Sequence, residues 1–473
     1  MTDLNVAVVG SGPSGLYAAD ALVKQAAKLD PPVTVQVDVI DRLPTPYGLV
    51  RYGVAPDHPS IKSIADVLRK VLEHPQVRFL GGVHLGDDVS REDLLASYDA
   101  VIYATGAMRD RRMGIEGEDL AGSHAATEFV NWYSGHPDMD TGAFKLDAES
   151  VAVIGVGNVA VDVARILVRD PEELARTDVS QPVLEALMAS NVREVHVIGR
   201  RGPAQAKFTT KELRELGELA GVDIAVPGPE ADLATFDACG EGGKLKESDR
   251  RVRGNLAVID DWAARCPDWS ARQLNDRWLN VRFWLRPVRI EGAGRVSGLI
   301  VERTRLDENG KLTGTGEYER MDVQMVLRSV GYQSVPLPGV PFDGKTTYTV
   351  PNEAGRVIGP DGAPLPREYV VGWLKRGPTG VIGTNKSDAA DTVKSLLADC
   401  APRQSPDGNG IAQATRDQLA GVLADRGVLP VSYTDWLRVE QAETDLATSL
   451  GRGARVKLPS REAIDAACRP LRQ

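Results

Sequence analysis

Cysteine is scarce and widely spaced in this chain of 473 residues. The four cysteines are Cys239, Cys266, Cys400 and Cys468. Because no two of them form a CxxC pair, the sequence contains neither a redox dithiol nor the ligand pattern of an iron–sulfur cluster. They are most simply reduced structural thiols of a cytosolic protein, and we expect no metal site.

Long apolar runs and an excess of positive charge are also missing. No apolar run approaches the length of about 18 residues that a membrane span needs, so we expect none. The formal net charge of −10 argues against general nucleic-acid binding. A strand pattern begins almost at the first residue, so we expect neither a signal peptide nor a transit peptide. With 42% hydrophobic and 26% charged residues, the composition is that of a folded chain. The length suggests about two to four domains.

A strand, a glycine turn and a helix open the chain. The apolar run 4–9 predicts a buried parallel strand, GSGPSG occupies residues 10–15, and residues 16–22 are typical of a helix. The first glycine allows a tight turn, the second lets a pyrophosphate approach the backbone, and the third lets the helix pack on the strand. A second strand, 35–40, ends in Asp41, a carboxylate suited to a ribose 2′-hydroxyl. This pattern predicts dinucleotide binding, and a tight turn without a ligand is the alternative.

The same pattern returns near residue 150. Residues 151–169 repeat the strand, a GVGNVA turn and the helix, and alanine is permitted at the third glycine position. The next strand, 194–198, ends in Gly-Arg-Arg-Gly without a carboxylate. Arg200 and Arg201 are suited to a 2′-phosphate, which they would hold through charge-assisted bidentate bonds. The first unit therefore suits a dinucleotide with a free 2′-hydroxyl and the second suits NADP. A solvated basic turn is the alternative for the two arginines.

Two loops between regular elements are unusual. Residues 43–59 contain too many prolines and glycines for a regular element, and a loop of this length inside an α/β domain is usually functional. A glycine-rich loop, 375–385, separates a predicted strand, 369–373, from a predicted helix, 386–397. The start of that helix could stabilise negative charge on a reduced ring, and an ordinary turn is the alternative.

The remaining stretches carry weaker patterns. Residues 222–282 show little periodicity, and strands are expected at 281–285, 296–303 and 321–330. Beyond residue 401 the chain becomes polar, and we expect a helical appendage.

These motifs in this order resemble the adrenodoxin reductase family of NADPH–ferredoxin reductases, and most closely its actinobacterial members. The specific runs are PTPYGLVR at 44–51, GVAPDHP at 53–59, GRRGP at 199–203, FT at 208–209 with ELREL at 212–216, and GWLKRGPTGVIGTN at 372–385. The resemblance implies an α/β fold with two Rossmann-like dinucleotide-binding domains, each in three layers. Residues 1–107 and 331–473 would form a discontinuous FAD domain that ends in the helical appendage. Residues 108–330 would form the NADP domain inserted into it.

The resemblance also implies roles for residues that match the family's motifs. The residues expected to contact FAD are Gly10, Gly12, Pro13, Ser14, Asp41, Leu49, Val83, Trp373, Gly380, Val381 and Ile382. The residues expected to contact NADP(H) are Arg111, Gly155, Gly157, Asn158, Val159, Arg200, Arg201, Glu212 and Gly380. Relatives commonly carry glutamate where this chain has the shorter Asp41.

His58 and Glu215 resemble the catalytic pair that the family places near the nicotinamide and the flavin. Hydride transfer itself requires no acid–base residue, so the two side chains are expected to orient the rings or to carry linked protons. Without the resemblance, a lone loop histidine is more often structural, and Glu215 would be one more charge on an exposed helix face.

The implied activity is that of an FAD-dependent NADPH–ferredoxin oxidoreductase in the cytoplasm. A hydride from NADPH would reduce the flavin, and single electrons would pass to a separate iron–sulfur ferredoxin. Ferredoxins are commonly acidic, so a basic face is expected to dock them. The candidates are Lys211, Arg214, Lys244, Lys246, Arg250, Arg251 and Arg253, and a solvated loop is their alternative. For the whole chain, there are two alternatives. One is an NADPH-dependent flavoprotein oxidoreductase acting on a small molecule such as a quinone. The other is a non-enzymatic, flavin-bearing structural or electron-transfer subunit of a larger complex.

Overall fold

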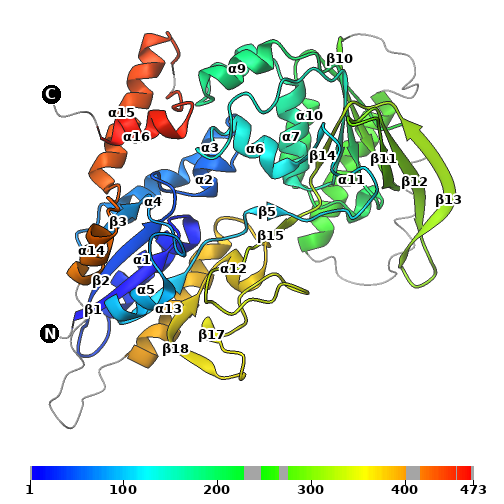
Figure 1. The fold of residues 1–473 in the computed structure, drawn as a ribbon. Coiled ribbons are helices and arrows are strands. Elements are labelled where there is room, and N and C mark those ends of the chain that lie inside the picture. Colours follow the sequence, from blue (N-terminus) through cyan, green and yellow to red (C-terminus); the bar gives the residue numbers. More distant parts are fainter. Residues whose placement is uncertain (1–2, 228–246, 266–274, 401–415, 454, 470–473) are drawn as a thin grey trace. The chain divides into compact units, whose positions relative to one another are not determined.

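The computed structural model describes residues 3–227, 247–265, 275–400, 416–453 and 455–469, and Figure 1 labels many of their elements. The chain divides into two compact units. The first comprises Met1–Arg109, Ser134–Asp138 and Tyr332–Gln473, and the second comprises Asp110–Tyr133 and Met139–Gly331. The short Ser134–Asp138 segment belongs to the first unit, which no sequence pattern had indicated.

A seven-stranded sheet forms the centre of the first unit, in the order β16-β17-β18-β4-β1-β2-β3. Its strands are β1 (Asp3–Val9), β2 (Thr34–Asp41), β3 (Val77–Gly81), β4 (Ala100–Tyr103), β16 (Asn352–Glu353), β17 (Arg356–Ile358) and β18 (Pro364–Val370). The five strands from β18 to β3 are parallel, and β16 and β17 extend the sheet in antiparallel fashion. The carboxyl ends of β1, β2 and β4 therefore lie at one edge, where open α/β sheets bind their ligands.

Helices cover both faces of this sheet and give the unit three layers. Side chains alternate along β1, so that Val6 and Val8 face one layer while Ala7 and Val9 face the other. The first layer contains α1 (Pro13–Ala26), α4 (Ile64–Leu72), α13 (Thr384–Cys400) and α15 (Tyr433–Ser449). The second contains α5 (Arg91–Ser97) and α14 (Arg416–Asp425).

The C-terminal helices complete the core of the first unit, so they are not an appendage to it. Trp436 and Val439 of α15 are fully buried in the same cluster as β1 and α1. Gly81 of β3 and Val431 exchange two backbone hydrogen bonds, each 2.8 Å long. Figure 1 shows α14, α15 and α16 (Arg461–Cys468) in orange to red, with α15 beside β3.

The second unit is built on a parallel sheet of six strands in the order β6-β14-β7-β8-β10-β9. Its strands are β6 (Ser123–Ala125), β7 (Ser150–Ile154), β8 (Glu194–Ile198), β9 (Val222–Ala225), β10 (Arg277–Arg282) and β14 (Met325–Arg328). The helices of this unit are α6 (Ala126–Tyr133), α7 (Asn158–Val168), α8 (Pro171–Leu174), α9 (Gln181–Met188), α10 (Thr210–Gly217) and α11 (Glu247–Arg265), with a 3₁₀ turn, η1, at Pro203–Gln205. A separate antiparallel sheet joins β11 (Leu285–Glu291), β12 (Gly298–Leu306) and β13 (Leu312–Met321).

Several short elements complete the described chain. They are α2 (Leu49–Tyr52), α3 (Pro59–Lys62), α12 (Trp373–Arg376), β5 (Arg109–Asp110) and β15 (Tyr332–Gln333). The stretch 43–59, expected to lack regular structure, thus contains one short helix and the first residue of another. Among the described residues, no helix is both long enough and apolar enough to cross a bilayer.

Candidate functional sites

The first glycine turn joins β1 to α1 in a conformation that only small residues permit. Gly10 has a φ of +118°, and a Cβ atom there would lie 2.5 Å from the carbonyl oxygen of Ala104. A Cβ atom on Gly15 would lie 1.9 Å from the carbonyl oxygen of Gly10, so the helix packs against the turn. At Gly12, by contrast, the nearest atom to such a Cβ lies 4.0 Å away. Gly12 therefore leaves the backbone open to a phosphate at the start of α1, where N–H groups and the helix dipole favour an anion.

Asp41 lies at the end of β2, directly beside this turn. One of its carboxylate oxygens accepts hydrogen bonds from the backbone N–H of Ser11 at 2.7 Å and from the Ser11 hydroxyl at 2.6 Å. The other oxygen accepts the N–H of Leu43 at 2.9 Å. A carboxylate has about four acceptor positions. Asp41 therefore retains capacity for a ribose hydroxyl at the carboxyl edge of the sheet.

The loop that follows β2 crosses the glycine turn. The N–H of Tyr47 donates to the carbonyl of Ser11 at 3.1 Å, and a Cβ atom on Gly48 would lie 3.0 Å from the Cα atom of Gly12. Leu49, which begins α2, keeps 37% of its surface exposed and is available to a ligand. Val83 is 1% exposed, so its side chain belongs to the core and only its backbone could meet FAD.

The glycine-rich loop after β18 exposes the other predicted flavin contacts. The indole N–H of Trp373 donates to the carbonyl of Thr379 at 3.1 Å, and its ring lies 5.6 Å from that of Tyr332. Gly380 and Val381 are exposed just before α13, whereas Ile382 is partly buried against the core. Sequence reasoning missed Tyr332, because nothing in its neighbourhood marks it as a partner of Trp373.

A polar network joins this loop to the first glycine turn. The amide oxygen of Asn385 accepts hydrogen bonds from the hydroxyl of Ser14 at 2.9 Å and from the guanidinium of Arg376 at 2.8 Å. Asp388 accepts the N–H of Gly372 at 2.6 Å and forms an ion pair with Lys375 at 2.9 Å. Neither Asn385 nor Asp388 is marked as a site residue by the local sequence pattern. Through these contacts, the turn at 10–15, Trp373 and the loop that carries Gly380 form one site. The open backbone at Gly12 and the carboxylate of Asp41 fit the pyrophosphate and a ribose of FAD.

The second unit repeats the turn between β7 and α7. Gly155 has a φ of +141°, and a Cβ atom there would lie 2.2 Å from the carbonyl oxygen of Ser329. Around Gly157, no atom lies within 4 Å of the position that a Cβ would take. Asn158 begins α7, and its amide oxygen accepts the N–H of Thr209 at 2.8 Å. Val159 is partly buried in the first turn of the same helix.

Two arginines follow β8 at the carboxyl edge of this second sheet. Arg200 and Arg201 are exposed, and within the described ranges neither guanidinium forms an ion pair. Their backbone is fixed, because the carbonyl of Arg200 accepts the hydroxyl of Thr304 at 2.8 Å. The second unit thus presents two free cations where the first presents the carboxylate of Asp41. This arrangement fits NADP(H) with its 2′-phosphate.

Other predicted contacts in the second unit surround the start of α10. Glu212 accepts a hydrogen bond from the hydroxyl of Thr209 at 3.1 Å, and Thr209 caps the helix in turn. Arg111 is exposed, and its backbone N–H donates to Gly331 at 2.9 Å.

The two residues of the expected catalytic pair lie in different units. His58 is 8% exposed and occupies the N-cap position of α3 in the first unit. Glu215, in α10 of the second unit, forms an ion pair with Lys211 at 3.8 Å.

Five of the seven basic residues expected to dock ferredoxin lie on two helices that pack together. Thr210 of α10 donates to the amide oxygen of Asn255 of α11 at 2.7 Å. The exposed cations on these helices are Lys211, Arg214, Arg250, Arg251 and Arg253. The remaining two candidates, Lys244 and Lys246, lie outside the described residues.

The described cysteines are poor nucleophiles. Cys400 and Cys468 are free thiols, and burial raises the pKa of each to about 11. Few thiolates therefore form at neutral pH. Cys239 and Cys266 lie outside the described residues.

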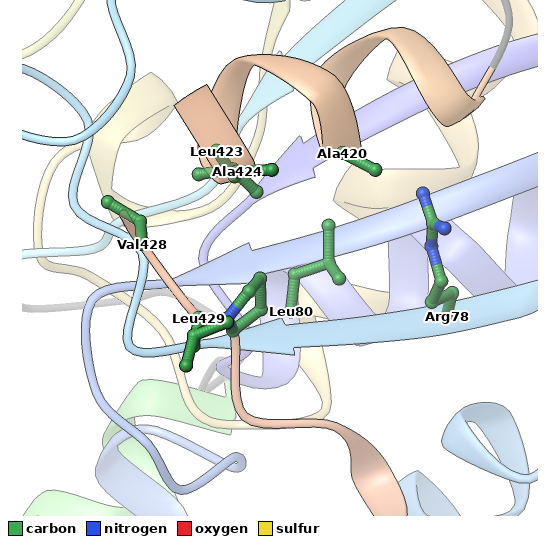
Figure 2. A pocket seen from close by; sticks show the side chains of 8 residues that line it. Arg78, Leu80, Ala420, Leu423, Ala424, Val428 and Leu429 are labelled. Carbon is green, nitrogen blue, oxygen red and sulfur yellow. The ribbon is translucent and has the colours of Figure 1, made fainter. Parts of the chain in front are cut away.

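A small apolar pocket lies between β3 and α14, away from the predicted contacts. Figure 2 shows Leu80 and Arg78 on one side, with Leu423, Ala424 and Val428 on the other. Its volume of about 150 Å³ is below the roughly 300–1,000 Å³ typical of small-molecule sites. No predicted cofactor residue lines it.

Two glycine turns, each at the carboxyl edge of its own parallel sheet, define a protein that binds two dinucleotides. The family model for pyridine nucleotide-disulphide oxidoreductases matches residues 4–225. NADPH-ferredoxin reductase FprA of Mycobacterium leprae is 43% identical over 460 residues, and the match covers 96% of each chain. The mitochondrial NADPH:adrenodoxin oxidoreductase of Arabidopsis thaliana is 39% identical, and that match covers 94% of this chain and 91% of the relative.

A solved structure, Mycobacterium tuberculosis FprA in complex with NADPH, is similar along its whole length. It has a TM-score of 0.90 and 42% identity, covering 98% of this chain and 99% of that one. The chain therefore belongs to the family of NADPH–ferredoxin and adrenodoxin reductases. The resemblance that the motifs indicated is confirmed, and so is the α/β fold with two dinucleotide-binding units.

Proposed function

We propose that this protein is an FAD-dependent NADPH–ferredoxin reductase that works in the cytoplasm. The observation that carries the proposal is the opposite charge at two equivalent positions. Asp41 follows β2 in the first unit, and Arg200 with Arg201 follows β8 in the second. A carboxylate selects a free ribose hydroxyl, whereas two arginines select a 2′-phosphate. Relatives named for NADPH and for ferredoxin or adrenodoxin, similar along almost the whole chain, support the same assignment.

In the first unit, the residues around the glycine turn hold FAD. Gly10, Gly12, Pro13 and Ser14 receive the pyrophosphate at the start of α1, and Asp41 holds the ribose. Leu49 and Trp373 border the flavin ring, with Val83 contributing through its backbone. Gly380, Val381 and Ile382 present backbone at the start of α13, where the helix dipole favours negative charge. FAD supplies the redox chemistry, because a flavin accepts a hydride from NADPH and releases electrons singly to an iron–sulfur protein.

In the second unit, the chain orients NADPH and selects it over NADH. Gly155, Gly157, Asn158 and Val159 form the turn that receives its pyrophosphate. Arg200 and Arg201 hold the 2′-phosphate, and Arg111 and Glu212 complete the contacts that this unit supplies. Gly380, the remaining residue expected to contact NADP(H), belongs to the first unit.

His58 and Glu215 are the proposed catalytic pair, whose side chains orient the reacting rings or carry linked protons. The burial of His58 suits a side chain that excludes water, and Glu215 is only partly exposed on α10. Glu215→Gln removes the charge and keeps the shape. If Glu215 carries a proton, this change alters the pH profile of flavin reduction while the affinity for NADP⁺ is unchanged.

The deciding experiment is anaerobic. The purified protein, loaded with FAD, is mixed with NADPH, and cytochrome c reduction is followed with and without a ferredoxin from the same source. We expect flavin bleaching by NADPH and a rate of cytochrome c reduction that depends strongly on ferredoxin. Bleaching without any gain from several ferredoxins would instead favour an oxidoreductase for small molecules such as quinones.

A further inference from the structure

The loop that crosses the first glycine turn has a strained backbone. Tyr47 has a φ of +80°, which side-chain-bearing residues rarely adopt, and Gly48 follows with a φ of +49°. These two residues are also the ones that touch Ser11 and Gly12. Such a conformation persists only where the surroundings hold it. The contacts that hold this loop therefore decide whether Tyr47 and Gly48 stay packed against the first glycine turn.

A buried ion pair holds the loop to the C-terminal helices. The guanidinium of Arg51 donates to both carboxylate oxygens of Glu443 in α15, at 3.2 Å and 2.5 Å. The side chains are 5% and 0% exposed, so water does not screen the pair. The Arg51 guanidinium also lies 4.9 Å from the ring of Trp436. That ring in turn makes an edge contact with Tyr47, at 6.0 Å between centroids.

A buried lysine fixes the same loop through its backbone. The ammonium of Lys457 donates to the carbonyl of Arg51 and to the carbonyl of Ser134, both at 2.7 Å. Lys457 is 1% exposed, and its ammonium lies 5.5 Å from the ring of Tyr52. One cation from the C-terminal segment thus joins two chain segments far from it in sequence. An ammonium is buried at such cost only where carbonyls or carboxylates satisfy it.

We propose that Glu443 and Lys457 are positioning residues for FAD, which hold the Tyr47–Tyr52 loop against the glycine turn before the cofactor binds. This inference rests on the proposed function. It assigns the C-terminal helices a role in forming the flavin site, in addition to their part in the core. Without the clamp of Arg51, Glu443 and Lys457, the loop relaxes from its strained conformation. FAD then binds only the fraction of molecules in which the loop is in place, and its apparent affinity falls by that fraction.

The test compares FAD affinity with stability in three variants of the full chain. Glu443→Gln and Lys457→Met each break the clamp while keeping the shape of the side chain. Asp38→Asn is the matched control, because Asp38 is a fully buried carboxylate of the same unit that Arg78 binds at 3.0 Å and 2.5 Å. The dissociation constant for FAD is measured by titrating the apo-protein, and the thermal midpoint is measured on the same samples.

We expect both clamp variants to bind FAD about tenfold or more weakly, which corresponds to a loop in place in about one molecule in ten. The absorbance bands of the bound flavin should shift, because Leu49 lies within this loop and moves when the loop relaxes. Asp38→Asn should lower the thermal midpoint and leave the FAD dissociation constant unchanged. Equal FAD affinity in wild type and clamp variants would overturn the inference. Failure of the wild type itself to bind FAD would overturn the proposed function instead.

A second measurement needs no variant. Amide hydrogen exchange of residues 50–52 in the wild-type apo-protein reports whether the loop is formed before FAD arrives. We expect slow exchange that FAD changes little. Exchange as fast as in an unfolded chain, slowed only by FAD, would show that the cofactor and not the clamp orders the loop. This result decides the matter even if Glu443→Gln fails to fold.

Discussion

Asp41 and Ser11 are joined twice, because the backbone N–H and the hydroxyl of Ser11 both donate to one carboxylate oxygen of Asp41. Ser11 lies between the first two glycines of the turn, so this pair fixes Asp41, the proposed ribose acceptor, relative to the proposed phosphate site. The contact also bears on the expectation, implied by the family resemblance, that a glutamate would stand at the position of Asp41. Ser11 lies close enough for the shorter side chain to reach the turn.

Removing the Asp41 carboxylate should weaken FAD binding. The change Asp41→Ala takes away a charged acceptor for the ribose and releases Ser11. Hydrogen bonds to charged groups contribute about 1.5–3 kcal/mol, which predicts a loss of about 10- to 150-fold in FAD affinity. Titration of the apo-protein with FAD measures the loss. Asp20→Ala, which removes a surface carboxylate paired with Lys24 on α1, serves as the control and should bind FAD as the wild type does.

Replacing Arg200 and Arg201 together by alanine should impair the use of NADPH and spare that of NADH. The 2′-phosphate is present only in NADPH, so the loss of its two cations should raise the NADPH KM by about 10- to 150-fold. Steady-state kinetics with both nucleotides measure the ratio. Arg176→Ala, at an exposed position of the same unit, is the matched control. Equal weakening of the two nucleotides would refute the 2′-phosphate role.

His136 should make the first unit less stable in mild acid. Burial lowers the pKa of its imidazole to about 4 from the ordinary 6.5, and its ring lies 4.9 Å from that of Tyr52. Asp138 opposes the shift, and nearby arginine and lysine cations add to it. Between pH 6.5 and 4, the unfolded chain therefore binds a proton that the folded chain does not. The free energy of unfolding falls as the pH falls through this window.

The expected loss between pH 7 and pH 5 is about 2 kcal/mol from this one group. Urea unfolding of the apo-protein at the two pH values measures it. His136→Phe keeps an aromatic ring against Tyr52 and removes the titration, so its stability should change less over the same interval. An identical pH dependence in the wild type and the variant would show that other groups cause the loss.

Docking of ferredoxin should weaken as salt is added. Raising the ionic strength from about 0.1 M to about 1 M shortens the Debye length from about 10 Å to about 3 Å. The ferredoxin KM should then rise several-fold, while reduction of a neutral quinone should not change. Reversing the charge at Arg250 and Arg253 should reproduce the effect at low salt. Arg289→Glu, at an exposed residue of β11 in the same unit, is the control.

Much of the fold was predictable, because central parallel strands such as β4 and β7 are short and buried along their whole length. β8 occupies Glu194–Ile198, as expected, and β7 differs from the expectation by a single residue. The strand expected at 281–285 was wrong, since Trp284 has a φ of +59° and the chain turns there between β10 and β11. β13 was missed because half of its residues are exposed, including Tyr318 at 63%, so its side chains show no alternation of apolar and polar residues.

For the candidate sites, the sequence indicates those residues whose role depends on the few residues next to them in the chain. Gly10 and Gly155 were found because a tight turn after a strand requires glycine at that place. The roles of Asn385 and Glu443 were not found, because their hydrogen-bond partners are distant in the chain. Ser14 lies 371 positions from Asn385, and Arg51 lies 392 positions from Glu443. No periodicity or spacing in a single sequence connects residues so far apart.

The position of β18 in the first sheet imposes an order on how a nascent chain can fold. β4 pairs with β1 on one side and with β18 on the other, but β18 leaves the ribosome only after the whole second unit has been synthesised. Until then, one edge of β4 stays unpaired, and such edges invite misassembly. Lys457, which anchors Arg51, emerges later still. Synthesis of the first unit therefore begins before that of the second and ends after it. A ribosome that stalls before residue 457 leaves the Tyr47–Tyr52 loop without the hydrogen bond from Lys457.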